Sequence, residues 1–509
     1  MLLPARTEAA AVAPSDRATR PLGLEAETWL LVGITVLAAA VRFANITSQS
    51  FWLDESQAVH EVHLSFGAML HAWSSFEWNG PLYLLIAWPW AKVFGAGELG
   101  LRSLSAVLGV ALVPLIYLCG RELVSRRAGL VAALFTAVSP FMIWYSQEAR
   151  EYMLLMVLCA ASLLFFSRAW KSSGTANVAW WAAFSALALL TQYFAGFLIA
   201  AEAVALLYRA RNRTTVLAVA GLAVVGAALI PHLTPRLHHP AEFIVGVPLS
   251  QRIEQVPVTF GMSTLYQSPI VSYGLIGAAA LAAIVIALLV IGADERELRG
   301  AGLAAALAGA VLLVPLVLAA LGHDDYLARG LMPAWIPLVI VIAAACTTRR
   351  AALAGGVLAV AVIALFVYSG LRIDTYSQFR KPDWSGVASA LGSSSSTRAI
   401  VAYDGPFAAG PLSIYMPGIA WAGPGMAPQS GAPVTVSEVD IVGNTAQHLS
   451  ALPPGTRLLS SRDVNGYRVV RLGLARPWHL PPAAIGARAE QLLGPAPSGP
   501  SVLIQPRSA

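Results

Sequence analysis

Long apolar stretches separated by short polar segments dominate the first 370 residues of the chain. A helix needs about 20 apolar residues to cross the roughly 30 Å hydrocarbon layer of a membrane, with every backbone amide paired inside the helix. The pattern predicts about a dozen such helices, over 28–45, 81–95, 102–120, 128–145, 152–167, 177–190, 192–208, 214–231, 271–292, 300–321, 331–346 and 351–370.

The pattern changes at about residue 371, where long apolar runs end and proline, glycine and serine become frequent. Within this tail, 384–391 has the pattern of a helix, and 398–403 and 466–472 have the pattern of strands. The predicted fold is therefore an all-α polytopic membrane domain followed by a small soluble α/β domain. Its expected parts are a cytoplasmic polar leader over 1–27, a multi-spanning domain over 28–370 and an extracytoplasmic domain over 371–509.

Composition supports a membrane protein. Of the 509 residues, 57% are hydrophobic and 12% are charged, which is more apolar surface than a soluble core can bury. The formal net charge of +6 comes largely from arginine in short loops, and nothing resembles a nucleic-acid-binding surface. The three cysteines lie in or at the ends of predicted helices, without metal-ligand spacing.

Basic loops predict the orientation of the chain. The leader and three short loops are rich in arginine, which places them in the cytoplasm: 121–127, 208–213 and 347–350. The acidic segment 46–79 then lies outside. An odd number of crossings must separate this segment from 121–127, although the apolar pattern marks two. We therefore expect 81–95 to be re-entrant or broken.

Acidic residues stand out at the mouths of the predicted helices. Asp54 and Glu55 follow the first apolar span, within Phe51–Ser56. Two further polar motifs, Glu77–Tyr83 and Ser146–Tyr152, flank later spans. An acid pair in a loop is often only solvated. In a chain with so few charges, however, three such motifs at helix mouths favour a catalytic site that faces a lipid-borne substrate.

This set of motifs resembles the polyprenyl-phosphate-sugar glycosyltransferases of the GT-C fold. That group contains the protein O-mannosyltransferases (family 39 type) and the aminoarabinose transferases. The match is strongest over 28–210 and is almost letter for letter at Ser146–Tyr152. The second motif is matched less well at Asn79 and Gly80, and Ala328–Pro337 resembles an Arg-Tyr-Leu-x-Pro helix start with Gly330 in the aromatic position.

The resemblance implies roles for individual residues. Asp54 is the expected general base, and Glu55 is expected to orient it or to bind the acceptor. Adjacent carboxylates are expected to raise each other's pKa. Arg150 and Arg329 are the expected phosphate contacts, because the arginine fork binds two phosphate oxygens at once. The other expected substrate contacts are Glu148, Tyr152, Asn79 and Tyr83.

No certain cofactor follows from the sequence. A divalent metal ion is possible, with Asp54, Glu148, His60 and His63 as candidate ligands, but their spacing matches no defined motif. A solvated interfacial helix is the favoured explanation for the two histidines, and an ion pair at a helix end is an alternative for Glu148.

The expected enzyme is a multi-pass glycosyltransferase of the bacterial plasma (inner) membrane, with its active site on the extracytoplasmic face. It would move a mannose-like or other hexosyl or pentosyl group from a polyprenyl phosphate to a lipid, glycan or protein acceptor. A transporter or flippase of lipid-linked sugars is the main alternative, and a glycan polymerase or ligase is a third. Transporters place ionisable groups near the membrane midplane, whereas the acids here cluster at helix mouths.

Overall fold

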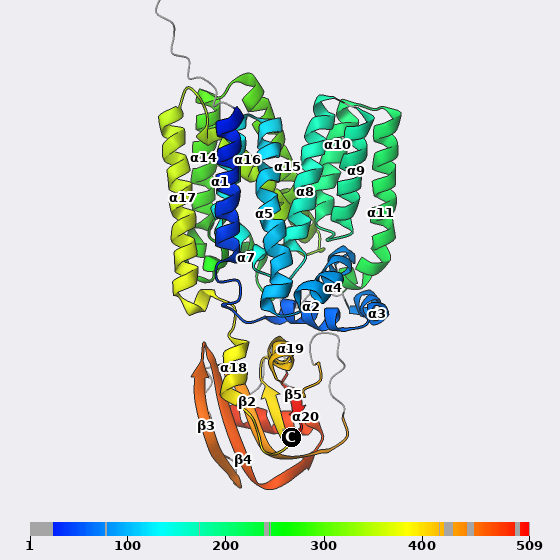
Figure 1. Cartoon of the computed structure of the whole chain (residues 1–509), viewed down its shortest axis with the longest axis vertical. Helices are drawn as coiled ribbons and strands as arrows, with labels where there is room; N and C mark the ends of the chain where they lie inside the picture. The colour runs from blue at the N-terminus through cyan, green and yellow to red at the C-terminus, as the bar shows by residue number, and fades with distance from the viewer. Residues whose placement is uncertain are drawn as a thin grey trace, which may run out of the picture.

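A computed structural model describes most of the chain as a helical bundle with a sheet domain at one end (Figure 1). The described residues are 24–76, 79–172, 174–238, 244, 246–416, 418–421, 431–444, 452, 454–493 and 499–507. Most of the predicted leader, and Glu77 and Trp78 of the second motif, therefore lie outside the described residues.

The bundle consists of helices that mostly run side by side (Figure 1). Their bounds are α1 (Leu24–Phe43), α5 (Glu98–Leu123), α6 (Arg126–Val138), α7 (Pro140–Ser146), α8 (Tyr152–Lys171), α9 (Thr175–Leu189), α10 (Ala195–Arg209), α11 (Arg213–His238), α14 (Gly274–Gly292), α15 (Glu295–Ala320), α16 (Trp335–Cys346) and α17 (Ala352–Thr375). The other described helices before the sheet domain are α2 (Leu53–His63), α3 (Phe66–Phe76), α4 (Leu82–Phe94), α13 (Leu249–Met262) and the 3₁₀ turns η1 (Ser263–Gln267), η2 (Pro269–Tyr273), η3 (Met332–Ala334) and η4 (Ser377–Phe379).

Within the described residues, seven helices are long and apolar enough to cross a membrane, and the bent pair α6 and α7 would make an eighth. Helices α9, α10 and α16 lie in the same bundle but have only 15, 15 and 12 residues. The multi-pass helical fold is confirmed, whereas the predicted dozen spans exceeds the number that helix length supports.

The length of helix α4 bears on how many times the chain crosses the bundle between segment 46–79 and loop 121–127. Its 13 residues reach about 20 Å, which is too short for a span. It lies with α2 and α3 at the end of the bundle nearest the sheet domain (Figure 1). Only α5 then runs between segment 46–79 and loop 121–127, and 81–95 contains one short continuous helix where a re-entrant or broken segment was expected.

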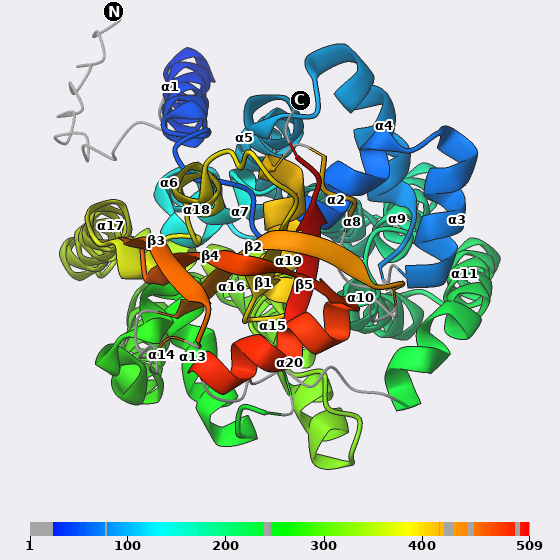
Figure 2. The same ribbon diagram turned by 90° about the horizontal axis from the view of Figure 1, so that it is seen from below.

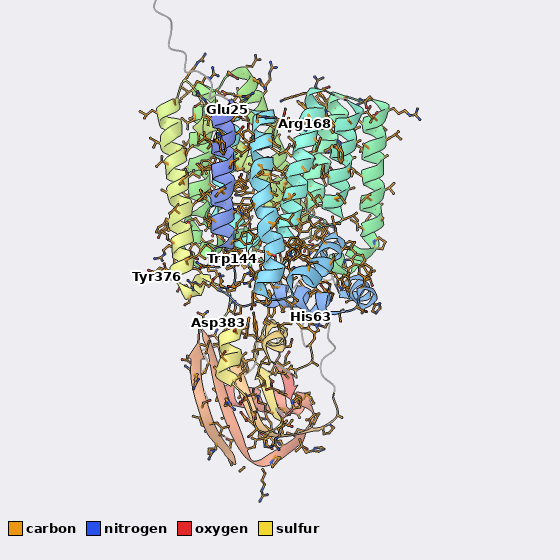
Figure 3. The ribbon with its side chains drawn as sticks, in the orientation of Figure 1. Glu25, His63, Trp144, Arg168, Tyr376 and Asp383 are labelled. Atoms are coloured by element: carbon orange, nitrogen blue, oxygen red, sulfur yellow. The ribbon has the colours of Figure 1, made fainter. Side chains whose placement is uncertain are left out.

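Loop 121–127 lies at the end of the bundle away from the sheet domain. Arg126 at the start of α6 pairs with Glu27 of α1 at 3.0 Å, so loop 121–127 lies beside the start of α1. In Figure 3, Glu25 and Arg168 lie at this end, whereas Trp144, His63 and Tyr376 lie near the sheet domain. Loop 121–127 and the start of α1 therefore lie at the end of the bundle opposite the acidic segment 46–79.

A sharp bend places the third motif near the sheet domain. Helices α6 and α7 meet at 58°, where Ser139 caps α7 and Pro140 cannot donate a backbone hydrogen bond. Buried Arg42 donates to the carbonyls of Thr136 and Ala137, at 2.9 and 3.0 Å, which the bend would otherwise leave without partners. Arg42 also donates to Ser146 Oγ at 3.1 Å, which ties α1 to the motif.

In the described part of the tail, five strands form one mixed sheet in the order β3-β4-β2-β1-β5. β1 pairs in parallel with β2, and the other pairs are antiparallel. The bounds are β1 (Arg398–Ala402), β2 (Val434–Asn444), β3 (Thr456–Val464), β4 (Tyr467–Leu480), β5 (Ser501–Gln505), α18 (Trp384–Leu391), α19 (Pro406–Tyr415) and α20 (Pro482–Leu493).

Alternate residues of the strands pack on opposite faces of this sheet. Ile400 and Ala402 pack with α18 and α19, whereas Ala399 and Val401 pack with α20. Figure 2 shows α18 and α20 on opposite sides of the strands. The helix predicted over 384–391 and the two predicted strands are confirmed as α18, β1 and the first half of β4.

Candidate active site

Asp54 lies at the rim of the site, in the first turn of α2. Its Oδ2 accepts a hydrogen bond from Arg329 Nη1 at 2.8 Å. The two side chains are 21% and 28% exposed, so both are partly open to solvent. Arg329 lies in the segment between α15 and η3, which brings residues 275 positions apart into contact.

Glu55 points in the opposite sense, into the protein, and is fully buried. Arg102 binds both of its oxygens, at 2.7 and 2.8 Å. Lys381 Nζ lies 3.0 Å from Oε2, and the Ala149 amide donates to Oε1 at 2.9 Å. Through these contacts Glu55 connects α2 with α5, the Ser146–Tyr152 motif and the segment before α18.

The charges around Glu55 determine its ionisation. Burial alone would raise the pKa of this carboxyl, but Lys381 and Arg102 outweigh burial and lower the pKa to about 2. The expectation that the adjacent acids raise each other's pKa is therefore wrong for Glu55. The reason is that its neighbours in space are cations, which the sequence places far from it.

Glu148 is a second buried carboxylate. It is fully buried, and neither of its oxygens has a hydrogen-bond partner. The Nζ atom of Lys381 lies 3.9 Å from its Oε2. Burial, with the charges of Glu55 and Asp54, raises the pKa of Glu148 to about 7, and the charge of Lys381 opposes this rise. Glu148 thus titrates near neutral pH inside the site.

Arg150 links the third motif to the rim. Its Nη1 donates to the backbone carbonyl of Asp54 at 3.3 Å, and its Nε lies 3.0 Å from Glu151 Oε2. Asn79 donates to Glu151 Oε1 at 2.8 Å, so the second motif joins the same network. The structure therefore brings all three sequence motifs together around Asp54.

The two predicted tyrosines are buried around this network. Tyr152, at the start of α8, is 3% exposed and packs edge to face against Tyr145 at 4.7 Å. Tyr83, on α4, is also 3% exposed. Both form part of the wall of the site, and neither lies open to solvent as a surface contact would.

The four candidate metal ligands are not brought together. His60 stacks on Trp421 at 4.6 Å, and burial followed by the charge of His63 lowers the pKa of His60. Exposed His63 contacts the Val59 carbonyl at 2.7 Å through Nδ1. Among the described residues, no group of three His, Cys, Asp or Glu side chains could hold a metal ion. The residues of the site thus do not fit a metal centre of protein ligands alone.

Two close approaches explain departures from the family motifs. A Cβ atom on Gly80 would lie 1.9 Å from the Leu190 carbonyl oxygen, where the start of α4 pairs with the turn after α9. A Cβ atom on Gly330 would lie 2.6 to 2.9 Å from the ring of Phe194. Phe194 therefore occupies the space that a side chain at position 330 would need.

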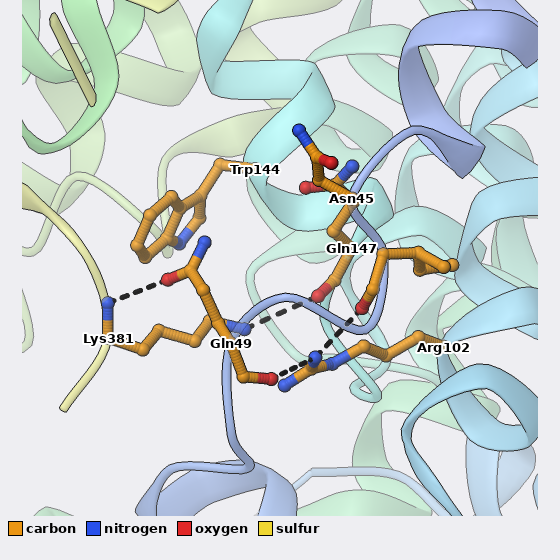
Figure 4. Close-up of a pocket in the computed structure, with 7 residues that line it drawn as sticks. Asn45, Gln49, Arg102, Trp144, Gln147 and Lys381 are labelled. Atoms are coloured by element: carbon orange, nitrogen blue, oxygen red, sulfur yellow. Dashed lines mark hydrogen bonds between the residues drawn. The ribbon is translucent and has the colours of Figure 1, made fainter. Parts of the chain in front are cut away.

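The sequence did not point to three residues of the buried centre: Arg102, Trp144 and Lys381. Together with Gln147 of the Ser146–Tyr152 motif they line a pocket of about 10 Å³, which is room for about one water molecule (Figure 4). One signal was present for Arg102, because an arginine at the start of an apolar span calls for a buried partner. Nothing local marks Lys381, since its partners lie more than 200 residues away.

Comparison with known proteins identifies the fold of the chain. Residues 79–234 match the family model of dolichyl-phosphate-mannose-protein mannosyltransferases. The crystal structure of ArnT from Cupriavidus metallidurans in the apo state superposes with a TM-score of 0.53 at 14% identity, covering 88% of this chain and 98% of ArnT. The chain has the GT-C fold. No curated protein matches its sequence.

Two further solved structures are similar at lower scores. ArnT from Cupriavidus metallidurans bound to undecaprenyl phosphate has a TM-score of 0.49 at 13% identity, over 87% of this chain and 98% of that one. The oligosaccharyltransferase AglB from Archaeoglobus fulgidus, in complex with an inhibitory peptide and a dolichol-phosphate, has a TM-score of 0.45 at 12% identity, over 71% and 57%. The matched family segment includes Asn79, Glu148 and Arg150 but neither Asp54 nor Arg329.

Proposed function

We propose that this GT-C protein is an integral-membrane glycosyltransferase that moves a sugar from a polyprenyl phosphate to an acceptor, with Asp54 as the general base. The observation that carries the proposal is the half-open pair of Asp54 and Arg329 at one end of the bundle, with Arg150 beside it. The match of 79–234 to a family named for dolichyl-phosphate-mannose supports the donor class.

The proposed reaction forms one bond and breaks one. An acceptor hydroxyl or amine attacks the anomeric carbon of the sugar, and Asp54 takes the proton that the acceptor loses. The bond between that carbon and the phosphate oxygen breaks, and the polyprenyl phosphate leaves with the electron pair. Attack from the face opposite the leaving group inverts the configuration of the anomeric carbon. A positioned base of this kind contributes about 10²–10⁴-fold in rate.

The leaving phosphate needs fixed positive charge. Arg329 and Arg150 both lie within reach of Asp54 atoms, at 2.8 and 3.3 Å, so a phosphate bound between them would hold the sugar carbon near the carboxylate. Asn79 and Glu148 act on this arrangement indirectly in our proposal. Asn79 holds Glu151, the partner of Arg150, and Glu148 lies behind the rim beside Lys381.

We place the site on the extracytoplasmic face of a bacterial inner membrane. This placement is supported by the basic loop 121–127, which lies at the opposite end of the bundle from Asp54. The sugar is a mannose-like hexose or a pentose in this proposal, and the acceptor is a lipid, a glycan or a protein. Fold alone does not choose among them.

A transporter or flippase would need ionisable groups along a path through the bundle. One buried carboxylate inside the helices is Glu202 of α10, which accepts hydrogen bonds from Ser162 Oγ at 2.6 Å and Trp181 Nε1 at 2.8 Å. These partners account for Glu202 as a contact between α8, α9 and α10. The clustering of the other motifs at one end favours the enzyme.

The test is a transfer assay with the purified protein in nanodiscs and a panel of polyprenyl-phosphate sugars. Release of polyprenyl phosphate and labelling of acceptor are measured for wild type, Asp54→Asn and the control Asp374→Asn. Asp374 is an exposed acid at the end of α17, on the same side of the bundle. Transfer by wild type and the control but not by Asp54→Asn supports the proposal. Equal transfer by all three overturns the assignment of the base.

A further inference from the structure

We propose that Lys381, in the segment joining the bundle to the sheet domain, is a positioning residue for Asp54. Through this segment the sheet domain holds the start of α2, and with it Asp54, in the position that the proposed reaction needs. The inference rests on the proposed function, since it concerns the base of that reaction. It assigns the tail a role other than the acceptor recognition or lid that a soluble domain beside a membrane site would suggest.

Lys381 reaches into the centre of the helical bundle's site. The residue is 6% exposed, and its Nζ lies 3.0 Å from Glu55 Oε2 and 3.3 Å from the Gln147 carbonyl oxygen. The ammonium group also lies 5.5 Å from the centre of the Trp144 ring. Figure 4 shows the side chain extending from its backbone towards Gln147 beneath Trp144. A lysine of the tail therefore completes a cluster otherwise built from bundle residues.

Other contacts from the tail reach the same acidic segment. The Lys381 amide donates to Gln49 Oε1 at 2.8 Å, and Ser50 Oγ donates to the Pro382 carbonyl at 3.2 Å. Tyr415 of α19 accepts from the Phe51 amide at 2.6 Å and donates to Glu98 at 2.6 Å. These contacts fall immediately before Asp54 in the chain, so the tail anchors the entry to α2.

The charges of the cluster explain why a cation is needed at position 381. Glu55 and Glu148 are both fully buried. Of these two carboxylates Arg102 binds Glu55, through both oxygens, and it also donates to the carbonyls of Ile46, Gln49 and Ser50. Glu148 has no hydrogen bond, and Lys381 is the cation that lies near both carboxylates. Without it, Glu55 would keep Arg102, but Glu148 would lose the ammonium group that lies 3.9 Å from its Oε2, and the cost of that change would act on the cluster that holds the first turn of α2. Asp54 is in that turn.

The expected consequence is a loss of turnover. A reacting group misplaced by about 1 Å lowers the rate by about 10²-fold. Because Lys381 is buried behind the rim, its loss should change kcat and leave the acceptor KM nearly unchanged. A tail that acted by recognising the acceptor would show the opposite, a raised KM with kcat retained.

The experiment compares full-length Lys381→Met and Lys381→Arg in nanodiscs, with Lys171→Met as the control. Lys171 pairs with Glu122 at 2.9 Å at the other end of the bundle. We expect Lys381→Met to lower kcat by about 10–10²-fold, to leave acceptor KM within about two-fold, and to speed hydrogen exchange of the amides of residues 53–60. Lys381→Arg should retain part of both properties, and Lys171→Met should change neither.

Unchanged kcat together with unchanged amide exchange in Lys381→Met would overturn the inference, and so would a change in acceptor KM alone. If wild type transfers no sugar, the proposed function fails, and amide exchange still decides whether Lys381 holds α2. If Lys381→Met does not fold, the double variant with Glu148→Gln removes the charge that Lys381 balances. That variant should fold again, and its failure to do so would also count against the inference.

Discussion

The rim and the buried centre of the site contain adjacent residues of the same chemistry in opposite environments. Asp54 is 21% exposed and pairs with one arginine, whereas Glu55 is fully buried and is held by Arg102, Lys381 and an amide. One peptide bond separates the open acid from the buried one. The helical geometry of α2 turns successive side chains about 100° apart, which sends one to the surface and the other inside.

The partly exposed pair and the buried pair are suited to different roles, the first to a reaction and the second to stability. A partly exposed ion pair contributes little to folding, so Asp54 and Arg329 remain free to exchange partners when a substrate arrives. A buried pair is costly to break, because the remaining charge has no water around it. The rim is therefore suited to catalysis, and the centre is suited to holding the rim in place.

The largest effect should come from Asp54→Asn. The amide cannot take a proton from the acceptor, so we expect transfer to fall by about 10²–10⁴-fold. The melting temperature should change little, since the side chain is partly exposed. Turnover and thermal unfolding of the same nanodisc preparation check both parts. A large loss of stability would contradict this prediction, because it would show that Asp54 has the structural role we assign to the buried residues.

Arg102→Met should show the reverse pattern, a large loss of stability. Removing one partner of a buried pair typically costs about 3–5 kcal/mol. The matched control is Arg299→Met, whose partner Glu295 and own side chain are 79% and 76% exposed, and which should change stability by less than about 1 kcal/mol. Thermal unfolding in detergent measures both. Similar small losses in the two variants would contradict the distinction between rim and centre.

Arg329→Ala should weaken donor binding at the rim. A hydrogen bond to a charged group contributes about 1.5–3 kcal/mol, which corresponds to a rise in donor KM of about 10–10²-fold. Arg372→Ala, near the end of α17, is the control, because Arg372 packs over Tyr376 at 4.1 Å. Initial rates at varied donor concentration measure the effect. An unchanged donor KM would leave Arg329 as a partner of Asp54 alone.

The smallest expected effect is on the pH dependence of stability. Burial raises the pKa of Glu148 from its ordinary 4.5 to about 7, so the folded protein keeps a proton there that the unfolded chain has lost. This group therefore makes stability fall as pH rises from about 4.5 to about 7. Glu148→Gln should remove that slope and raise the melting temperature above pH 7 relative to wild type.

The pKa of Glu55 shifts in the opposite direction, so the two carboxyls affect stability in different pH ranges. Its pKa lies below the ordinary value, at about 2, so its contribution to stability is lost only as pH falls below about 4.5. Glu55 stays ionised between pH 5 and 8. A change in melting temperature over that range therefore reports on Glu148. The same slope in wild type and Glu148→Gln would show that another group titrates there.

Elements with a strong local pattern were predictable. The apolar spans, the helix Trp384–Leu391 and strand β1 follow from hydrophobic periodicity, and the failure of 81–95 to span follows from the charges of its flanking loops. Three polar motifs also pointed to one site, and the structure brings them together around Asp54. The number of spans was less predictable, because apolar runs do not reveal where a helix ends.

By itself the sequence determined a multi-pass helical membrane protein with a small α/β tail and acids at one end of the bundle. These features depend on composition and on patterns within about 20 residues. Only the tertiary structure decided that Glu55 is buried and Asp54 open, and that Lys381 serves both Glu55 and Glu148. Those roles depend on partners 47 to 326 residues away, whose charges act through space and leave no local signal in the chain.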